Sequence, residues 1–421
     1  MKRVFNLLVS IILLAGFSAC NKDNSGNQQQ VPENPNPAPV PTVNYKGLTF
    51  ISSGNSTVCL AKVGAPDEIT LEYSTDESHW NPYTIGEKIA LADGTFLLFR
   101  AGEQKNLKFS KDSRNYYHFE ITGPISAQGS IMSLLDRDFS TTLPERCAFC
   151  SLFKGCTSLL SAPELPATTL ALYCYMRMFE GCSALTSAPK LPATTLALFC
   201  YKSMFEGCSA LTSAPELPAT TLADACYDSM FEGCSALTSA PELPATTLAD
   251  ACYAAMFSEC TGLKSAPELP AKVATRDCYL SMFSGCSALT SAPELPATKI
   301  DQYCYKRMFE QCTGLTDAPK LPATSLASFC YSNMFEGCTS LTSAPELPAT
   351  ELVDACYNLM FKDCSKLQYV KALFTTKPSE DTTKEWLSGV APSGTFIKNK
   401  NATWNVTGAH GIPEGWKVET E

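Results

Sequence analysis

The sequence predicts an α/β repeat solenoid of short strands and short helices, preceded by a small all-β sandwich. The main observation is a column of cysteines spaced 26 residues apart without a break. The column consists of Cys156, Cys182, Cys208, Cys234, Cys260, Cys286, Cys312, Cys338 and Cys364. Phenylalanine, methionine, tyrosine and further cysteine columns keep the same period, and periods of roughly 20 to 50 residues are typical of solenoids. We therefore expect nine stacked units over residues 141–370.

The first part of each unit predicts a short helical segment. Cys174, Met178 and Phe179 lie at helix-like spacing, so their side chains can face one side. Gly181 follows, where a left-handed residue is expected to end the helix.

The second part of each unit predicts a brief strand. In the same unit it is centred on residues 185–188, because Pro189 and Pro192 donate no ladder hydrogen bond. One unit buries too little apolar surface to fold alone, so we expect neighbouring units to share one continuous core.

The repeated motif resembles a known family. The segment MFEGCSALTS recurs at Met178, Met204 and Met230, and it resembles the BspA-type leucine-rich repeats of bacterial surface proteins. The resemblance covers about residues 147–370 and departs from the family in the second cysteine column and the APELPAT segment. It implies a solenoid of the leucine-rich-repeat type that binds extracellular-matrix or other surface proteins.

The N-terminus predicts export and a lipid anchor. Lys2 and Arg3 precede an apolar run over residues 4–15, as in a signal peptide. Ser18 and Ala19 then precede Cys20, an order that resembles the lipobox of bacterial lipoproteins. The resemblance implies cleavage before Cys20, acylation of its thiol and a lipid-anchored, surface-exposed place in the outer membrane; an ordinary secretory signal is the alternative.

Three further segments complete the predicted organisation. Residues 21–43 are rich in proline and glutamine and predict a disordered tether. Residues 44–140 predict an immunoglobulin-like β-sandwich, because β-branched and aromatic runs alternate with turn signals. In this sandwich Trp80 and Tyr83 are candidate glycan-binding residues. Residues 371–421 predict a C-terminal cap, because a solenoid must cover its last apolar face.

Composition argues against several kinds of function. The formal net charge of −10 and the lack of a basic stripe exclude nucleic acid as a partner. The three histidines are scattered over the flanking regions, so the sequence predicts no catalytic constellation, no metal site and no cofactor. Cys147 and Cys150 form a single C-x-x-C pair, which we interpret as an irregular first repeat rather than a zinc site.

The paired cysteine columns leave thiols and disulfides as alternatives. If the segment between Cys174 and Cys182 is helical, their Cα atoms lie on the order of 10 Å apart at ~1.5 Å per residue, beyond the ~7 Å limit for a bridge. Equivalent cysteines of adjacent units could pair only alternately. This favours buried thiols that act as small apolar residues.

Variation among the units indicates where a partner could bind. The positions around the column tyrosine change freely between units, whereas the core columns do not. The candidate protein-binding residues there are Arg177, Lys202, Asp228, Arg276, Lys306 and Arg307. We call these six residues the variable edge.

A second column on the units is acidic. It contains Glu164, Glu216, Glu242, Glu268, Glu294 and Glu346, interrupted by Lys190 and Lys320. The column predicts either a solvated edge or a surface for calcium or a basic partner.

The sequence therefore predicts a non-catalytic cell-surface lipoprotein that acts in adhesion or host-protein interaction. The alternatives are a carbohydrate-binding lipoprotein that uses the sandwich, and a passive structural scaffold.

Overall fold

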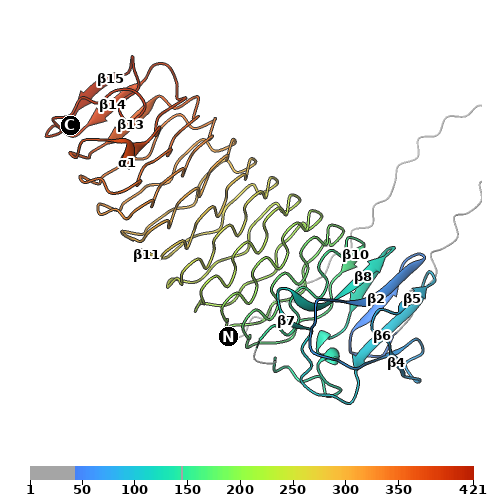
Figure 1. The fold of residues 1–421 in the computed structure, drawn as a ribbon. Helices are drawn as coiled ribbons and strands as arrows, with labels where there is room; N and C mark the ends of the chain where they lie inside the picture. The colour runs from blue at the N-terminus through green and yellow to red at the C-terminus, as the bar shows by residue number, and fades with distance from the viewer. Residues whose placement is uncertain (1–42, 144–145) are drawn as a thin grey trace, which may run out of the picture. The chain divides into compact units, whose positions relative to one another are not determined.

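The computed structural model describes residues 43–143 and 146–421. The predicted signal peptide, the predicted acylation site Cys20 and all but the last residue of the predicted tether lie outside these ranges. Figure 1 shows two sheets near the N-terminal end of the described chain, followed by a stack of coils.

The expected all-β part is present as two sheets, which share one apolar core with the solenoid. The six-stranded sheet has the order β10-β9-β1-β6-β3-β4 and the four-stranded sheet the order β5-β2-β8-β7. The strands are β1 (Thr49–Ser52), β2 (Ser56–Val63), β3 (Leu71–Ser74), β4 (Asn81–Tyr83), β5 (Lys88–Leu91), β6 (Phe96–Ala101), β7 (Ser110–Asp112), β8 (Asn115–Thr122), β9 (Ile125–Gln128) and β10 (Leu159–Ser161). A 3-10 helix, η1 (Ile131–Leu134), follows β9. The immunoglobulin-like topology stays a prediction.

The sheets cover the first coil of the solenoid. Strand β10 belongs to that coil and pairs in parallel with β9. The Phe119 amide donates to the Leu152 carbonyl at 2.7 Å, and the Phe119 and Phe153 rings stack at 5.2 Å. The N-terminal part therefore shields the first apolar face of the stack, which a repeat protein requires for solubility.

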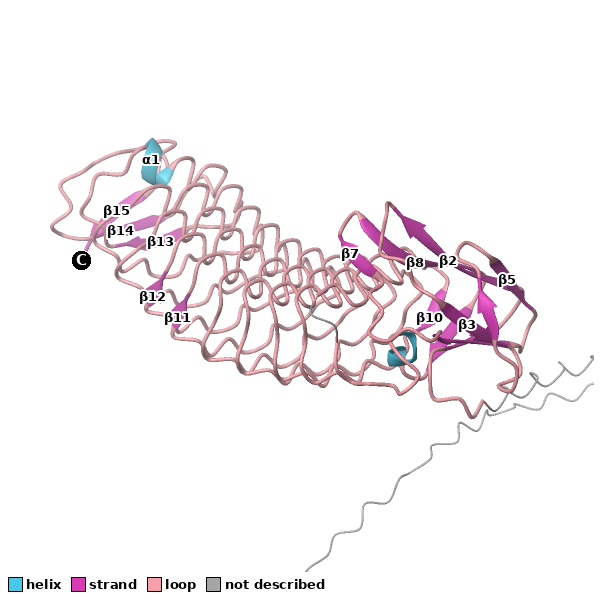
Figure 2. Cartoon of the chain, turned by 60° about the horizontal axis from the view of Figure 1, so that its bottom comes forward, coloured by secondary structure: helices cyan, strands magenta, loops and turns pink. Residues whose placement is uncertain are grey.

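The coils contain turns where the sequence predicted helices, so the α/β expectation is wrong. Figure 2 shows the repeats drawn almost entirely as loops. The only α-helix in the described ranges is α1 (Glu380–Thr383), in the C-terminal part. Strands within the repeats are equally short: β11 (Val273–Ala274) pairs in parallel with β12 (Lys299–Ile300), and isolated parallel bridges such as Ser239 to Ser265 join other coils.

The hydrogen bonds of a coil explain why it is not a helix. The amides of Tyr175 and Arg177 donate to carbonyls of the next coil, at 3.0 and 2.9 Å. The amides of Met176 and Met178 instead donate to carbonyls three residues back, at 3.2 and 3.1 Å. Alternate residues thus bond between coils and within a turn, which satisfies the backbone groups of this segment without a helix.

This bonding needs a left-handed residue at every fourth position. In one coil these residues are Tyr173, Arg177 and Gly181, with φ of 56°, 57° and 74°. The left-handed conformation predicted for Gly181 is confirmed. A non-glycine residue pays roughly 1–2 kcal/mol for this conformation, which the bonds between coils must offset.

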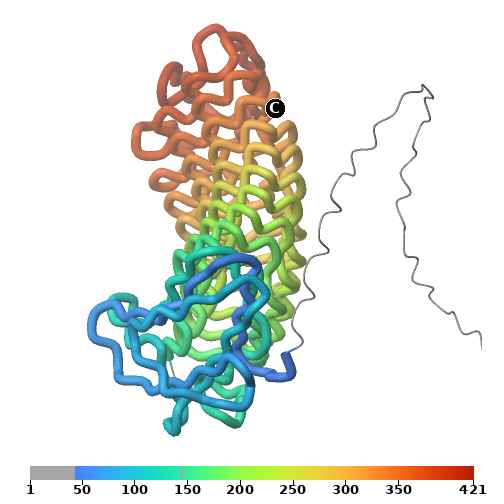
Figure 3. Tube along the Cα trace, turned by 90° about the vertical axis from the view of Figure 1, so that its right-hand side faces the viewer, coloured from blue at the N-terminus to red at the C-terminus, as the bar shows by residue number. Residues whose placement is uncertain are grey.

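The core consists of columns that run along the stack, and Figure 3 shows the successive coils that carry them. The rings of Phe205, Phe231 and Phe257 stack with centroids 5.6 and 5.7 Å apart and planes within 5°. The column tyrosines stack in the same way, for example Tyr201 on Tyr227 at 5.8 Å. Each coil therefore shields the apolar side chains of its neighbours, as predicted.

The column cysteines are buried thiols. All twenty cysteines in the described ranges are buried and unbridged. The Cys182 thiol donates to the Phe153 carbonyl at 3.1 Å, and Cys208 to Phe179 at 3.2 Å, so each contact joins one coil to the previous one. Burial raises the pKa of the Cys208 thiol to about 12, which keeps it protonated and unreactive.

The C-terminal residues continue the stack rather than forming a separate fold. Strands β13 (Tyr369–Ala372), β14 (Thr395–Lys398) and β15 (Lys417–Thr420) form a parallel sheet in that order. The fully buried Trp386 ring lies 6.3 Å from Tyr357 of the last regular coil, and its indole N–H donates to the Gly411 carbonyl at 2.9 Å. This segment covers the last apolar face.

Replacing Glu259 by glycine is expected to stabilise the protein by about 0.5–1 kcal/mol. Glu259 has a φ of 58° in a column where Gly233 and Gly285 have 72° and 75°, so its Cβ is strained there. Thermal and urea denaturation midpoints measure the effect. Glu259→Gln separates it from loss of charge, and Gly207→Ala is expected to destabilise by a similar amount; an unchanged or lower midpoint for Glu259→Gly contradicts the prediction.

Candidate functional site

The N-terminal half of the variable edge is occupied by contacts within and between coils. Lys202 forms an ion pair with Asp228 of the next coil, and its ammonium lies 5.6 Å from the Phe199 ring centroid. The Arg177 guanidinium lies 3.4 Å from the Glu180 carboxylate. All of these side chains are half-buried, so this half contributes charge pairs rather than free groups.

The C-terminal half of the edge presents more accessible charge. Arg276 is exposed and donates to the Gln302 side chain at 3.2 Å. Arg307 is exposed and lies 3.8 Å from Glu310. Such exposed contacts are weak and exchange readily for a partner's groups.

Two half-buried aromatic pairs lie along the variable edge, one in each half, and the sequence analysis did not identify them. Tyr303 stacks on Phe329 at 5.0 Å, and Tyr173 on Phe199 at 5.1 Å. The Lys306 ammonium lies 5.3 and 5.5 Å from the centroids of the first pair. Burial, helped by the adjacent guanidinium, lowers the pKa of Lys306. The sequence does contain a signal for these pairs. In their four units an aromatic residue comes just before the cysteine of the column that begins at Cys174, where most other units have alanine.

Acidic side chains at the end of several turn segments repel one another. Burial raises the pKa of Glu232, opposed by a hydrogen bond from Ser229, and Glu206 and Asp228 raise it further. The pKa of Glu310 is also raised by burial. This side of the edge therefore favours cationic groups.

The two candidate glycan-binding residues are not presented together on the surface. Tyr83 is buried, and its hydroxyl accepts from the Leu60 amide at 2.8 Å, so its ring belongs to the core of the sheets. Trp80 is half-buried, with the Arg100 guanidinium 3.9 Å from its ring centroid and the Tyr45 ring 5.2 Å away. Tyr83 is thus unavailable for stacking on a sugar, and the Trp80 ring is already in contact with two side chains.

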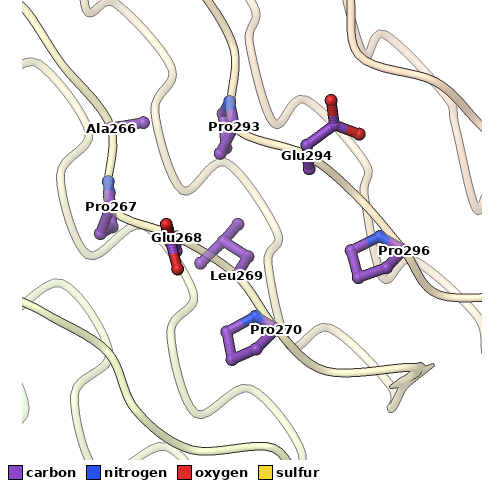
Figure 4. Close-up of a pocket in the computed structure, with 8 residues that line it drawn as sticks. All are labelled: Ala266, Pro267, Glu268, Leu269, Pro270, Pro293, Glu294 and Pro296. Atoms are coloured by element: carbon purple, nitrogen blue, oxygen red, sulfur yellow. The ribbon is translucent and has the colours of Figure 1, made fainter.

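The acidic column borders a series of hollows, which the sequence reasoning missed. Each hollow lies between the Ala-Pro-Glu-Leu-Pro segments of two neighbouring coils, or between one such segment and the Ala-Pro-Lys-Leu-Pro segment that contains Lys190. Figure 4 shows one of about 340 Å³, lined by Ala266, Pro267, Glu268, Leu269, Pro270, Pro293, Glu294 and Pro296. Equivalent hollows of about 350 to 510 Å³ occur at four more steps of the stack. We call this surface the Pro-Glu ladder.

The described ranges offer neither a metal-binding cluster nor a membrane-spanning helix. They contain no group of three or more histidine, cysteine, aspartate or glutamate side chains that could hold a metal ion. Nor does any helix within them have the length and hydropathy needed to cross a bilayer.

Comparison with known proteins identifies the repeat. Residues 281–377 match six copies of the family described as BspA type leucine-rich repeat region. No curated protein and no solved structure matches the chain. Leucine-rich repeats of this kind suggest a role in protein–protein binding or adhesion and are typically non-enzymatic. The match shows that residues 281–377 are a BspA-type leucine-rich-repeat region, and the same 26-residue period runs through the stacked coils that precede them.

Proposed function

We propose that this protein is a non-catalytic, lipid-anchored surface protein that binds extracellular or host proteins through the variable edge of its solenoid. The observation that carries the proposal is the contrast between two sets of positions. The core columns repeat almost without change, whereas the edge changes charge from coil to coil. A scaffold needs only the first set.

The C-terminal half of the edge is the part best suited to a partner. It combines the exposed Arg276 and Arg307 with the half-buried Tyr303–Phe329 pair. Arginine and aromatic residues are the types that dominate binding energy at protein interfaces. A long, gently varying surface also suits a protein better than a small substrate.

Binding of the full chain to immobilised extracellular-matrix proteins tests the proposal. The triple charge reversal Arg276→Glu, Lys306→Glu and Arg307→Glu is expected to weaken binding at least tenfold. Lys272→Glu, Lys299→Glu and Lys366→Glu form a matched control with the same change in charge at exposed positions away from the edge. Retained denaturation midpoints show that both variants fold.

Three results would overturn parts of the proposal. Equal losses in both triple variants would show that only net charge matters. Retention of the chain by a glycan array, abolished by Trp80→Ala, would favour the carbohydrate-binding alternative. A solenoid that added protease cannot reach on intact cells would exclude surface display.

A further inference from the structure

Two cysteines of the first coil stand outside the core columns. Cys147 occupies the position that carries Tyr173 in the second coil, and Cys150 the position that carries Met176 there and Lys202 one coil later. The two side chains are nevertheless buried, at 2% and 0% exposed. With Met176 and Tyr173 they form a small apolar cluster that is separate from the main core. This pair of thiols therefore has a surrounding of its own, which the stacked columns do not share.

The backbone brings the two side chains within reach of each other. The chain turns over residues 148–150, and the ends of a four-residue turn lie less than about 7 Å apart. A disulfide needs Cα atoms about 4.4–6.8 Å apart. In later coils the side chains at the same two positions lie side by side. The Lys306 ammonium is 5.3 Å from the Tyr303 ring centroid, and the Lys202 ammonium is 5.6 Å from that of Phe199.

The ionisation of Cys150 shows that the two thiols are close. Burial raises the pKa of the Cys150 thiol, a hydrogen bond with Ser151 lowers it, and the adjacent Cys147 raises it again. One thiol affects another in this way only at short range. A disulfide contains no ionisable group, so it suits a buried site where a thiolate is disfavoured.

Other uses of the two thiols fit less well. Among the described residues no third histidine, cysteine, aspartate or glutamate joins them in a metal-binding group, and structural zinc takes four ligands. The nearest column thiols are engaged elsewhere: Cys156 donates to the Phe119 carbonyl at 3.0 Å. The pair is therefore suited to bond within itself.

The turn that contains the pair joins the N-terminal sheets to the stack. The Phe109 amide, just before strand β7, donates to the Ala148 carbonyl at 3.0 Å. On the other side the Cys147 amide donates to the Leu172 carbonyl of the second coil at 2.8 Å. A covalent link across this turn would hold the backbone to which both parts are bonded.

We propose that Cys147 and Cys150 form a disulfide that closes the first turn of the solenoid, made by exchange with a disulfide oxidant such as oxidised glutathione. One cysteine, as thiolate, attacks a sulfur of the oxidant, which forms a mixed disulfide and releases one thiol. The other cysteine then attacks the mixed disulfide and releases the second thiol. The pair loses two electrons and two protons, and both are carried by the two released thiols. Only the place where the chain meets an oxidant, outside the cytoplasm, rests on the proposed function.

Refolding of the full chain in a glutathione buffer tests the inference independently of location. The reduced, unfolded chain is refolded with oxidised and reduced glutathione, unfolded without reductant, alkylated with iodoacetamide and digested with trypsin. Cleavage after Arg146 and Lys154 places both cysteines on one peptide, residues 147–154. We expect this peptide to be unalkylated and two hydrogen atoms lighter than the dithiol, whereas the peptides of the column cysteines are alkylated.

Thermal denaturation tests what the bridge does. Reductant is expected to lower the midpoint of the unsubstituted protein by roughly 2–4 °C. It should leave the double variant Cys147→Ser with Cys150→Ser unchanged. Cys59→Ser is the matched control, since Cys59 is a buried cysteine of strand β2 outside the columns, and it should keep the full shift.

The opposite results overturn the inference. An alkylated 147–154 peptide shows that no bridge forms, and a bridge from either cysteine to a column cysteine such as Cys174 shows that the pairing is wrong. A reductant shift that is absent from the unsubstituted protein, or that persists in the double variant, removes the role of the bridge in holding the junction. None of these results affects the proposed function, which is tested by charge reversal on the variable edge.

Discussion

Replacing Phe257 by alanine is expected to lower the free energy of unfolding by about 3–5 kcal/mol. The Phe257 ring is fully buried and stacks on the rings of both neighbouring coils, each at 5.7 Å. Its carbonyl also accepts from the Cys286 thiol at 3.1 Å. Because neighbouring coils supply most of each other's contacts, the cavity weakens two interfaces at once.

Urea denaturation followed by two signals measures this effect. The four tryptophans lie outside the regular coils, so their fluorescence reports the two ends, whereas circular dichroism reports the whole stack. We expect the circular dichroism transition of Phe257→Ala to shift to lower urea and to broaden. The exposed Thr261→Ala is the control, with a change within about 0.5 kcal/mol; a similar small change for Phe257→Ala would contradict the stacked core.

Removing the Trp386 side chain is expected to cost about 3–5 kcal/mol and to make the protein self-associate. Trp386 is fully buried against Phe374 at 5.8 Å and Phe396 at 6.1 Å. Without it, the last regular coil loses one of the two rings, those of Trp386 and Phe374, that cover Tyr357. An uncovered solenoid end is apolar and offers parallel pairing to another chain.

Size-exclusion chromatography and the fluorescence transition together test the role of Trp386. Trp386→Ala is expected to elute as larger species and to lose its fluorescence transition at lower urea than the circular dichroism transition. Trp386→Phe, which keeps a ring but loses the hydrogen bond to Gly411, should show a smaller loss and remain unassociated. A Trp386→Ala protein with unchanged elution and midpoint would show that other residues of this segment cover the stack.

The functional surfaces were only partly predictable from the sequence. Variation among units pointed to the six residues of the variable edge. It did not show which of them form ion pairs with neighbouring coils. The ion pair of Lys202 with Asp228 joins residues 26 positions apart, and only the stacking of coils brings them together. Tyr83 was a candidate glycan-binding residue, yet the structure buries its ring in the core of the sheets, where its hydroxyl accepts from the Leu60 amide.

The sequence by itself determined the stack of coils, the columns of its core and the left-handed Gly181, because a strict period places like residues in register whatever the local conformation. Only the tertiary structure decided that conformation. Cys174, Met178 and Cys182 recur every four residues, which fits one face of a helix and equally a chain of four-residue turns. The turns prevail because alternate amides find acceptors on the next coil, and no isolated unit contains those acceptors. The hollows of the Pro-Glu ladder have the same origin, since they lie between two coils and belong to neither.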